Sequence, residues 1–518
     1  MNIRLYNMIL IVCIVVAIPS SSFFLTAFLT EKITENNYSK VQFNYALGKD
    51  NQSALASAWN NSKVNSKRWF YFARKLAKTD GNAAHQLANY YQKQKLNVQA
   101  IAWYQRAMRL GFSPAFVALA QLYFEQNKLD KVDNVLSLLS EVQDASTRVE
   151  AKILSIQLAI HRGNIAYVQQ ELAESKKLIK STQLGRTLLN NINKYQIIAQ
   201  QEIQETSTRV SENHHYCANS IQFFSTNLRH LKHIEQLITQ FNQQALAKFV
   251  CFLPVRYLSI DSLECSSDTS KAISCNELKW QDFAETIDSR FVALLLPEGG
   301  ANVHLGVLYI DAQDELDVLT HEISHLLGFV DEYPLKKEHI KCQAVQSQPF
   351  SENIAVLPAV YQGQRNEVRA QVLAQLSWAE AIKSHTPILK PIKQNQPVNK
   401  LLWQLGTPKE FRQEVGVFYA QTCAKAVNQK VKKKVEFIAV KPIYNPTKMQ
   451  YFSLDFPLSY YENLEKSKGK YVMPSFHYNI ALAHYQNGDT QQAQYWLTQS
   501  LKWEEREARK NNILQGVF

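Results

Sequence analysis

Apolar residues recur three and four positions apart over a long stretch that begins near residue 40 and ends near 205. Strand-like alternation is almost absent there, and glycine and proline are few. This spacing predicts successive amphipathic helices that bury one face against each other. Part of the pattern returns after 32 residues, which indicates a repeated helical unit. The paired positions are Ala83 and Ala115, Leu87 and Leu119, Ala88 and Ala120, and Tyr91 and Tyr123.

These offsets resemble tetratricopeptide repeats, and the segment AIAWYQRAMRLGFSPAFVALAQLY is similar to their Sel1-like subclass. The resemblance implies a superhelix over 40–205 with a surface for a protein partner. A purely structural spacer is the alternative. A further unit of this kind is expected at 470–510, around FHYNIALAHYQNGDTQQAQYWLTQSL. A single repeat cannot bury its apolar face alone, so it should pack on another part of the chain or on a partner.

The pattern changes near 205–216, where short apolar strands begin to alternate with helices. Strands are expected at 219–225, 247–258, 290–297 and 302–311, and helices at 227–244, 279–289 and 367–385. This order predicts a mixed sheet in front of one central helix. The strand at 302–311 is expected to form the sheet edge to which an extended substrate adds. The whole chain is therefore expected to be α+β, with helical repeats on either side of a mixed-sheet domain.

The central helix carries the sequence HEISHLLGFVDEY at 321–333. His321 and His325 lie four residues apart, so on a helix they project from one face and can bind one zinc ion. Glu322 is placed to accept a proton from an attacking water. Gly328 lets the chain turn back, and Asp331 can then supply a third ligand. Three protein ligands leave a coordination position open, which is typical of catalytic zinc.

HExxH also occurs by chance on amphipathic helices, but the context here is narrower. The helix has one apolar stripe, acidic residues near its start and a glycine at its end. Glu367 and, less favoured, Glu352 are alternative third ligands if the site follows the glutamate-type zinc peptidase plan. His230 and His233 stand on an ordinary amphipathic helix and are interpreted as surface residues.

The motif HExxHxxGxxD resembles the metzincin zinc peptidases with aspartate as third ligand, and its ending DEY is similar to the IgA-peptidase-like family. The resemblance covers about 210–460 and implies a methionine turn below the metal. Met449, in the segment TKMQY, is the candidate for that turn. Tyr451 would then help to stabilise the tetrahedral intermediate. The long gap between Asp331 and Met449 implies an insertion.

The net charge of +12 is spread along the chain, and no nucleic-acid signature accompanies it. Residues 1–30 are mostly apolar and predict a signal anchor, which is favoured, or a cleaved signal peptide. Either segment implies export, to the periplasmic face of the inner membrane or, after cleavage, to the periplasm or the medium.

Six of the seven cysteines fall within the expected catalytic region, which favours disulfides in an exported domain. The favoured pairs are Cys217–Cys251, Cys265–Cys275 and Cys342–Cys423. Six separate buried thiols are the alternative.

These features together predict an exported endopeptidase with one catalytic zinc ion and a polypeptide substrate. Membrane attachment would come from the N-terminal segment, and no nucleic-acid partner is expected. One alternative is an envelope scaffold whose repeats bind partners while the metal fold is vestigial. Glu322 argues against this, because a relic has no need of a base beside its ligands. Another alternative is a zinc hydrolase that acts on peptidoglycan peptides or another amide.

Overall fold

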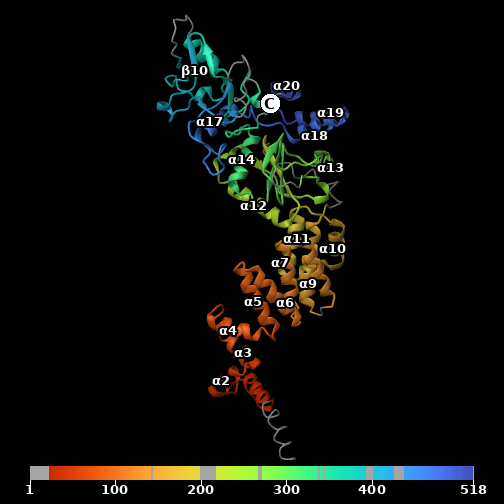
Figure 1. Ribbon diagram of the computed structural model, residues 1–518. Helices are drawn as coiled ribbons and strands as arrows, with labels where there is room; N and C mark the ends of the chain where they lie inside the picture. Colours follow the sequence, from red (N-terminus) through yellow and green to blue (C-terminus); the bar gives the residue numbers. More distant parts are fainter. Residues whose placement is uncertain are drawn as a thin grey trace, which may run out of the picture. The chain divides into compact units, whose positions relative to one another are not determined.

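The computed structural model describes residues 23–516 apart from gaps at 142–143, 199–216, 267–270, 280, 337–338, 344, 393–400 and 425–436. The chain forms two compact units (Figure 1). The first comprises residues 1–159 and 170–189, and the second residues 160–169 and 190–518. The division thus differs from the expected boundary near 205. Hydrogen bonds from Tyr257 to Ile160 (2.7 Å) and from Tyr195 to Glu235 (3.0 Å) explain why the end of the helical array belongs to the second unit.

The first unit is entirely helical in its described part, as the apolar spacing predicts. After a helix that ends at residue 34, it contains α2 (Lys40–Gly48), α3 (Gln52–Asn60), α4 (Lys67–Leu76), α5 (Gly81–Lys93), α6 (Asn97–Arg109), α7 (Pro114–Glu125), α8 (Leu129–Ser137), a 3₁₀ turn (Leu138–Glu141) and α9 (Ala145–His161). Two more helices, α10 (Ile165–Lys180) and α11 (Gln183–Lys194), cross the division between the units.

Small residues form the centre of the helical core. Ala83 and Ala88 on α5 are fully buried, and so are Ala115 and Ala120 at the equivalent positions of α7. The absence of large side chains at these points lets neighbouring helices approach closely. Burial therefore follows the same 32-residue spacing as the sequence, and the identity of the repeats stays a prediction.

The expected signal segment lies largely outside the described residues, which begin at residue 23. Within the described part of the chain, no helix is both long and apolar enough to cross a bilayer.

The second unit is built on a mixed sheet with the strand order β2-β1-β4-β6-β5, and β3 pairs with β1 beside β2. All neighbours are parallel except β5, which is antiparallel to β6. The expected strand at 302–311 is in fact a hairpin, because Leu305 and Gly306 adopt positive φ angles of 46° and 85°. The strands are β1 (Ser220–Ser225), β2 (Cys251–Phe252), β3 (Arg256–Tyr257), β4 (Phe291–Leu296), β5 (Asn302–His304) and β6 (Val307–Asp311).

Helices cover both faces of this sheet (Figure 1). On β4, Val292 and Leu294 point into a core shared with Phe476 and Trp496 of the C-terminal helices α18 (Phe476–Gln486) and α19 (Thr490–Leu501). Because side chains alternate along a strand, the residues between them face the opposite side, where α12 (Leu228–Phe241) and α14 (Leu316–Leu326) pack. The expected helix at 279–289 is shorter, with α13 limited to Gln281–Ala284.

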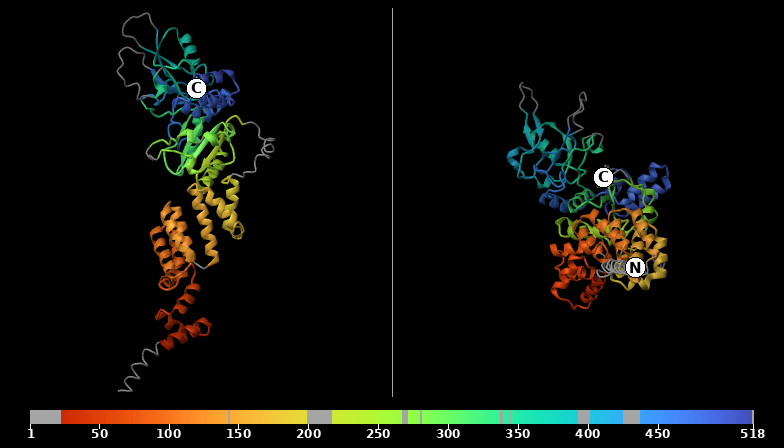
Figure 2. Two further views of the ribbon diagram at one scale, coloured as in Figure 1. Left: turned by 90° about the vertical axis from the view of Figure 1, so that its right-hand side faces the viewer. Right: turned by 60° about the horizontal axis from the view of Figure 1, so that its bottom comes forward.

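The C-terminal helix pair packs on this sheet. This contact buries the apolar face that a single repeat cannot bury alone. Buried Arg290 donates to the carbonyl oxygen of Met473 (2.8 Å) and forms an ion pair with Glu504 (2.5 Å). Arg509, on the last helix α20 (Glu507–Leu514), pairs with the same carboxylate at 3.3 Å. Figure 2 shows the C-terminal helices in blue beside the green sheet segment in both views.

The segment between Asp331 and Met449 has secondary structure of its own. It consists of two three-stranded sheets with the orders β8-β10-β9 and β11-β12-β7. The expected helix at 367–385 is shorter in the structure, where α15 covers Arg365–Leu373. The strands are β7 (Ala355–Pro358), β8 (Val360–Gln362), β9 (Leu389–Pro391), β10 (Leu402–Leu405), β11 (Phe418–Tyr419) and β12 (Phe437–Lys441), and α17 (Leu458–Ser467) follows the methionine segment.

Candidate metal centre

The structure brings His321, His325 and Asp331 to one point. Both histidines project from α14, and their Nε2 atoms lie 3.1 Å apart. The Oδ1 atom of Asp331 lies 3.1 Å from each of these nitrogens. One potential ligand atom from each residue lies within 4.8 Å of the others, so the group could hold a metal ion. The ligand set expected from the sequence is therefore the set that converges.

Gly328 makes the return of Asp331 to the helix geometrically feasible. It has a φ of +98°, which residues with a Cβ adopt only with strain. A Cβ at this position would lie 2.3 Å from the carbonyl oxygen of Tyr471. Beyond the turn, the side-chain amide of Asn353 both accepts from and donates to the backbone of Val330 at 2.8 Å. The loop that carries Asp331 is thus fixed at both ends of the turn.

We expect Gly328→Ala to lower the free energy of unfolding by more than about 3 kcal/mol, since backbone strain and a steric clash add together. Gly488→Ala is a matched control, because Gly488 also has a positive φ (+80°) but nothing lies within 4 Å of its added Cβ. The control should lose only about 1 kcal/mol. Urea denaturation of both variants measures the difference, and equal losses would contradict a steric role for Tyr471.

Backbone carbonyl groups orient both histidine rings. The Nδ1 atom of His321 lies 2.9 Å from the carbonyl oxygen of Lys448, and that of His325 lies 3.0 Å from the carbonyl oxygen of Phe329. A carbonyl oxygen only accepts, so each Nδ1 carries the proton and donates it. The Nε2 lone pairs then remain for a metal, which is the usual arrangement of histidine ligands.

The electrostatics of the centre favour a positive charge between the three residues. Burial raises the pKa of Asp331, but the charge on His325 and hydrogen bonds from both histidines overcome this and hold it well below its usual range. Burial opposes a charge on His325, yet the neighbouring carboxylates of Asp331 and Glu322 raise its pKa to about 9. A proton on His325 provides the compensating charge in this arrangement, and a divalent cation bound by the same atoms would take the place of that proton. The residues present therefore fit a metal ion.

Glu322 lines a cavity beside these three residues but does not belong to the ligand group. Its side chain is only 4% exposed, and its Oε2 atom has no hydrogen-bond partner among the described residues. Burial raises the pKa of Glu322 to about 7, with Asp331 and Asp314 acting in the same direction. A buried carboxylate with an unused oxygen and a pKa near neutrality can accept and return a proton.

A second tyrosine, Tyr333, lies beside the candidate ligands. Tyr333 lines the cavity, and its ring lies parallel to that of His321 with 6.5 Å between the centroids. Burial of the phenol and the nearby carboxylate of Asp331 raise its pKa. Tyr451 is 56% exposed and is not among the residues that line the cavity. The sequence motif contains Tyr333, but adjacency to the ligand Asp331 is the only signal for its position.

The methionine segment contacts the centre through its backbone. Met449 is fully buried, and its carbonyl oxygen accepts a hydrogen bond from the backbone N–H of Glu332 at 2.9 Å. The preceding residue, Lys448, supplies the carbonyl oxygen that orients His321. The segment of Lys448 and Met449 thus contacts both segments that carry the candidate ligands.

Glu332 holds these segments together, a role that the sequence does not reveal. Its carboxylate is fully buried and pairs with Lys441 of β12 at 2.6 Å. It also accepts hydrogen bonds from Thr447 at 2.9 Å and from Tyr460 of α17. These partners lie more than 100 residues away in the chain, so no local pattern could indicate them. A buried charge compensated in this way resists movement of the loop that carries Asp331.

The alternative ligands and the other histidines lie elsewhere. Glu352 is buried against Asn463 and Ser467, and Glu367 lies on α15 outside the ligand group. The interpretation of His230 as a surface residue is wrong: its side chain is 4% exposed and contacts Asn227. His233 is half-buried, with its Nε2 atom 3.0 Å from the carbonyl oxygen of Asp314, just ahead of α14.

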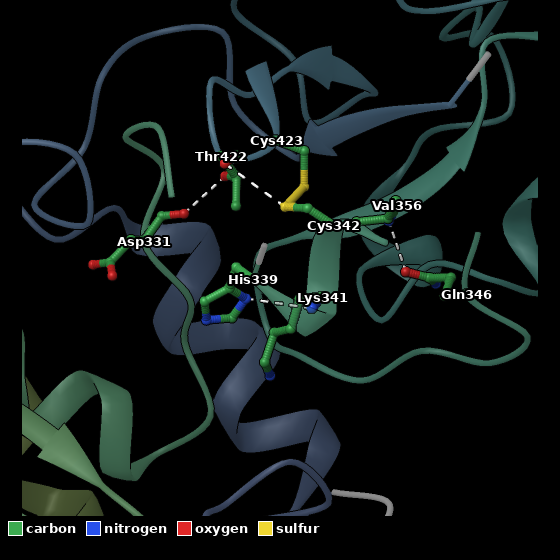
Figure 3. Close-up of a disulfide and its surroundings, with 8 residues drawn as sticks. All are labelled: Asp331, His339, Lys341, Cys342, Gln346, Val356, Thr422 and Cys423. Atoms are coloured by element: carbon green, nitrogen blue, oxygen red, sulfur yellow. Dashed lines mark hydrogen bonds between the residues drawn. A yellow bond between two sulfur atoms is a disulfide. The ribbon is translucent and has the colours of Figure 1, made fainter. Parts of the chain in front are cut away.

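All three expected disulfides are present: Cys217–Cys251, Cys265–Cys275 and Cys342–Cys423. They indicate that the protein folds in an oxidising environment, extracellular or periplasmic. The third disulfide lies beside the centre (Figure 3). Next to it, the Thr422 hydroxyl donates to the backbone carbonyl oxygen of Asp331 at 2.7 Å. The disulfide therefore holds the segment around Thr422 close to Asp331.

His325 and Asp331 line a cavity of about 480 Å³. Its lining includes Glu322 and His325 together with the residues of the edge strand β5. Comparison with protein-family models and with curated proteins finds no match to this chain. Functional assignment therefore depends on the geometry and chemistry of this centre.

Proposed function

We propose that this protein is an exported zinc-dependent endopeptidase of metzincin type. The observation that carries the proposal is the position of Glu322, a buried carboxylate with an unpaired oxygen beside the His321–His325–Asp331 group and on the wall of a cavity. Structural zinc sites are usually closed by four protein ligands and need no adjacent base. The His₂Asp set leaves a coordination position open towards substrate.

Bound zinc would supply Lewis-acid polarisation of the scissile carbonyl and lower the pKa of the attacking water. Glu322 accepts the proton of that water and returns it to the leaving amine, for which its pKa of about 7 is suitable. Tyr333, whose ring lies parallel to that of His321, would donate a hydrogen bond to the developing oxyanion. Tyr451 remains the candidate from the family resemblance, and its side chain is 56% exposed.

The edge strand β5 supports an extended peptide as substrate. It is the last strand of the sheet and lines the same cavity as Glu322. The side-chain amide of Asn479 donates to the carbonyl oxygen of His304 at 2.9 Å, so that end of the strand is already occupied. Backbone pairing with a substrate would use the part of the strand before His304. This edge replaces the longer one expected from the sequence.

The proposal is tested on the purified full chain by metal analysis and cleavage of a peptide library. One zinc ion per chain, with cleavage abolished by a chelator and restored by zinc, is the expected result. The alternative of a partner-binding scaffold with a vestigial metal site predicts zinc without cleavage of any peptide.

A further inference from the structure

Lys341 places a positive charge on the wall of the cavity that contains Glu322 and the metal ligands. It belongs to a short 3₁₀ turn, Ile340–Cys342, whose last residue forms the disulfide with Cys423. Figure 3 shows the side chain of Lys341, in this turn, and that of His339, just before it, extending on the side away from the disulfide. The cross-link fixes the backbone from which Lys341 projects, so its position is defined.

The ammonium group of Lys341 has no carboxylate partner within the described part of the chain. Its contact there is the ring of Phe350, whose centroid lies 4.8 Å from the Nζ atom. The carboxylates among the described cavity residues are those of Glu322 and Asp331, and both belong to the metal centre. Neither of them forms an ion pair with Lys341.

Two other lysines with little exposure in this unit are neutralised within the fold. Lys441 pairs with Glu332 at 2.6 Å, and Lys448 pairs with Asp317 at 2.7 Å. Lys341 differs from them, although burial disfavours its charged form as well and lowers its pKa to about 8. A half-buried cation without a carboxylate at a cavity wall is stabilised when an anion enters. The aromatic face of Phe350 holds the ammonium in place without neutralising it.

We propose that Lys341 is a specificity-determining residue that binds a carboxylate of the substrate in this cavity. The inference rests on the proposed peptidase function, and it specifies the substrate class as peptides with an acidic group near the scissile bond. The carboxylate can come from an Asp or Glu side chain or from the C-terminus of the substrate. The chemistry of recognition is the same for both sources.

The test measures peptide binding rather than turnover, in zinc-loaded full-length Glu322→Gln protein. Fluorescent peptides with an amidated C-terminus carry either glutamate or glutamine at successive internal positions. A third, neutral peptide has a free C-terminus. We expect the glutamate peptide, at one position, to bind at least roughly tenfold more tightly than its glutamine counterpart. Tighter binding of the free C-terminus alone would identify the terminal carboxylate as the ligand.

Lys341→Met should bring the affinities of acidic and neutral peptides to within about twofold, whereas Lys341→Arg should retain a preference. Lys336→Met is the matched control, because Lys336 is exposed on the same loop and does not line the cavity. The control should keep the full preference. Equal binding of all peptides by the parent protein, or a preference that survives Lys341→Met, would overturn the inference.

Cleavage by the protein with Glu322 intact separates this inference from the proposed function. Efficient cleavage without any acidic preference would refute the role of Lys341 and leave the peptidase intact. Lys341-dependent binding of acidic peptides without cleavage would refute the peptidase and leave the carboxylate site intact.

Discussion

Replacement of Glu322 by glutamine is expected to leave the zinc content at one ion per chain and to lower kcat/KM for peptide cleavage by about 100-fold or more. Glutamine keeps the size of the side chain but cannot accept the proton of the attacking water. Because Glu322 is not part of the ligand group, metal binding should not depend on it. Metal analysis and peptide cleavage on the same preparation measure both quantities.

Glu315→Gln is the matched control for this experiment. Glu315 stands at the start of the same helix, is exposed and makes no side-chain capping bond. Its replacement should change neither zinc content nor turnover. If Glu322→Gln cleaves peptides as fast as the parent protein, another residue must act as the base and the proposed mechanism fails.

Replacement of Asp331 by alanine is expected to weaken zinc binding by more than about 100-fold and to abolish cleavage at ordinary zinc concentrations. Loss of a residue that only orients a ligand already costs about 10–100-fold in metal affinity, and loss of a ligand itself should cost more. Two histidines alone bind zinc poorly. Titration with zinc in competition with a chelator gives the affinity.

The control is Glu367→Gln, which removes the carboxylate that a glutamate-type zinc peptidase would use. Glu367 lies on α15 outside the ligand group, so zinc affinity should stay unchanged. The opposite outcome, in which Glu367→Gln loses zinc and Asp331→Ala retains it, would replace the metzincin assignment with the glutamate-type plan. In that case the proposal of a zinc peptidase would still stand.

Local spacing is sufficient to predict the ligand group. A separation of four residues places His321 and His325 on one face of a helix whatever surrounds it. Gly328 and Asp331 follow within six residues, so the geometry of a single turn decides whether the third ligand returns. The same holds for the helical array, where small residues 32 positions apart occupy equivalent buried places.

Hydrophobic pattern is less reliable where a turn depends on backbone conformation. Residues 302–311 are apolar enough for one strand, yet positive φ angles at Leu305 and Gly306 fold them into a hairpin. The periodicity of the helix that carries His230 predicts a surface position for this residue. Its burial depends on tertiary packing, which that periodicity does not contain.

The sequence by itself determined the group of residues that could hold a metal, the position of Glu322 beside them and the helical character of the N-terminal unit, because each depends on contacts within a few residues. Only the tertiary structure placed Tyr333 beside His321 and assembled Glu332 with Lys441 and Tyr460. It also brought Lys341 to the cavity through a disulfide that spans 81 residues. Such contacts join segments far apart in the chain, and their formation depends on how the complete core packs.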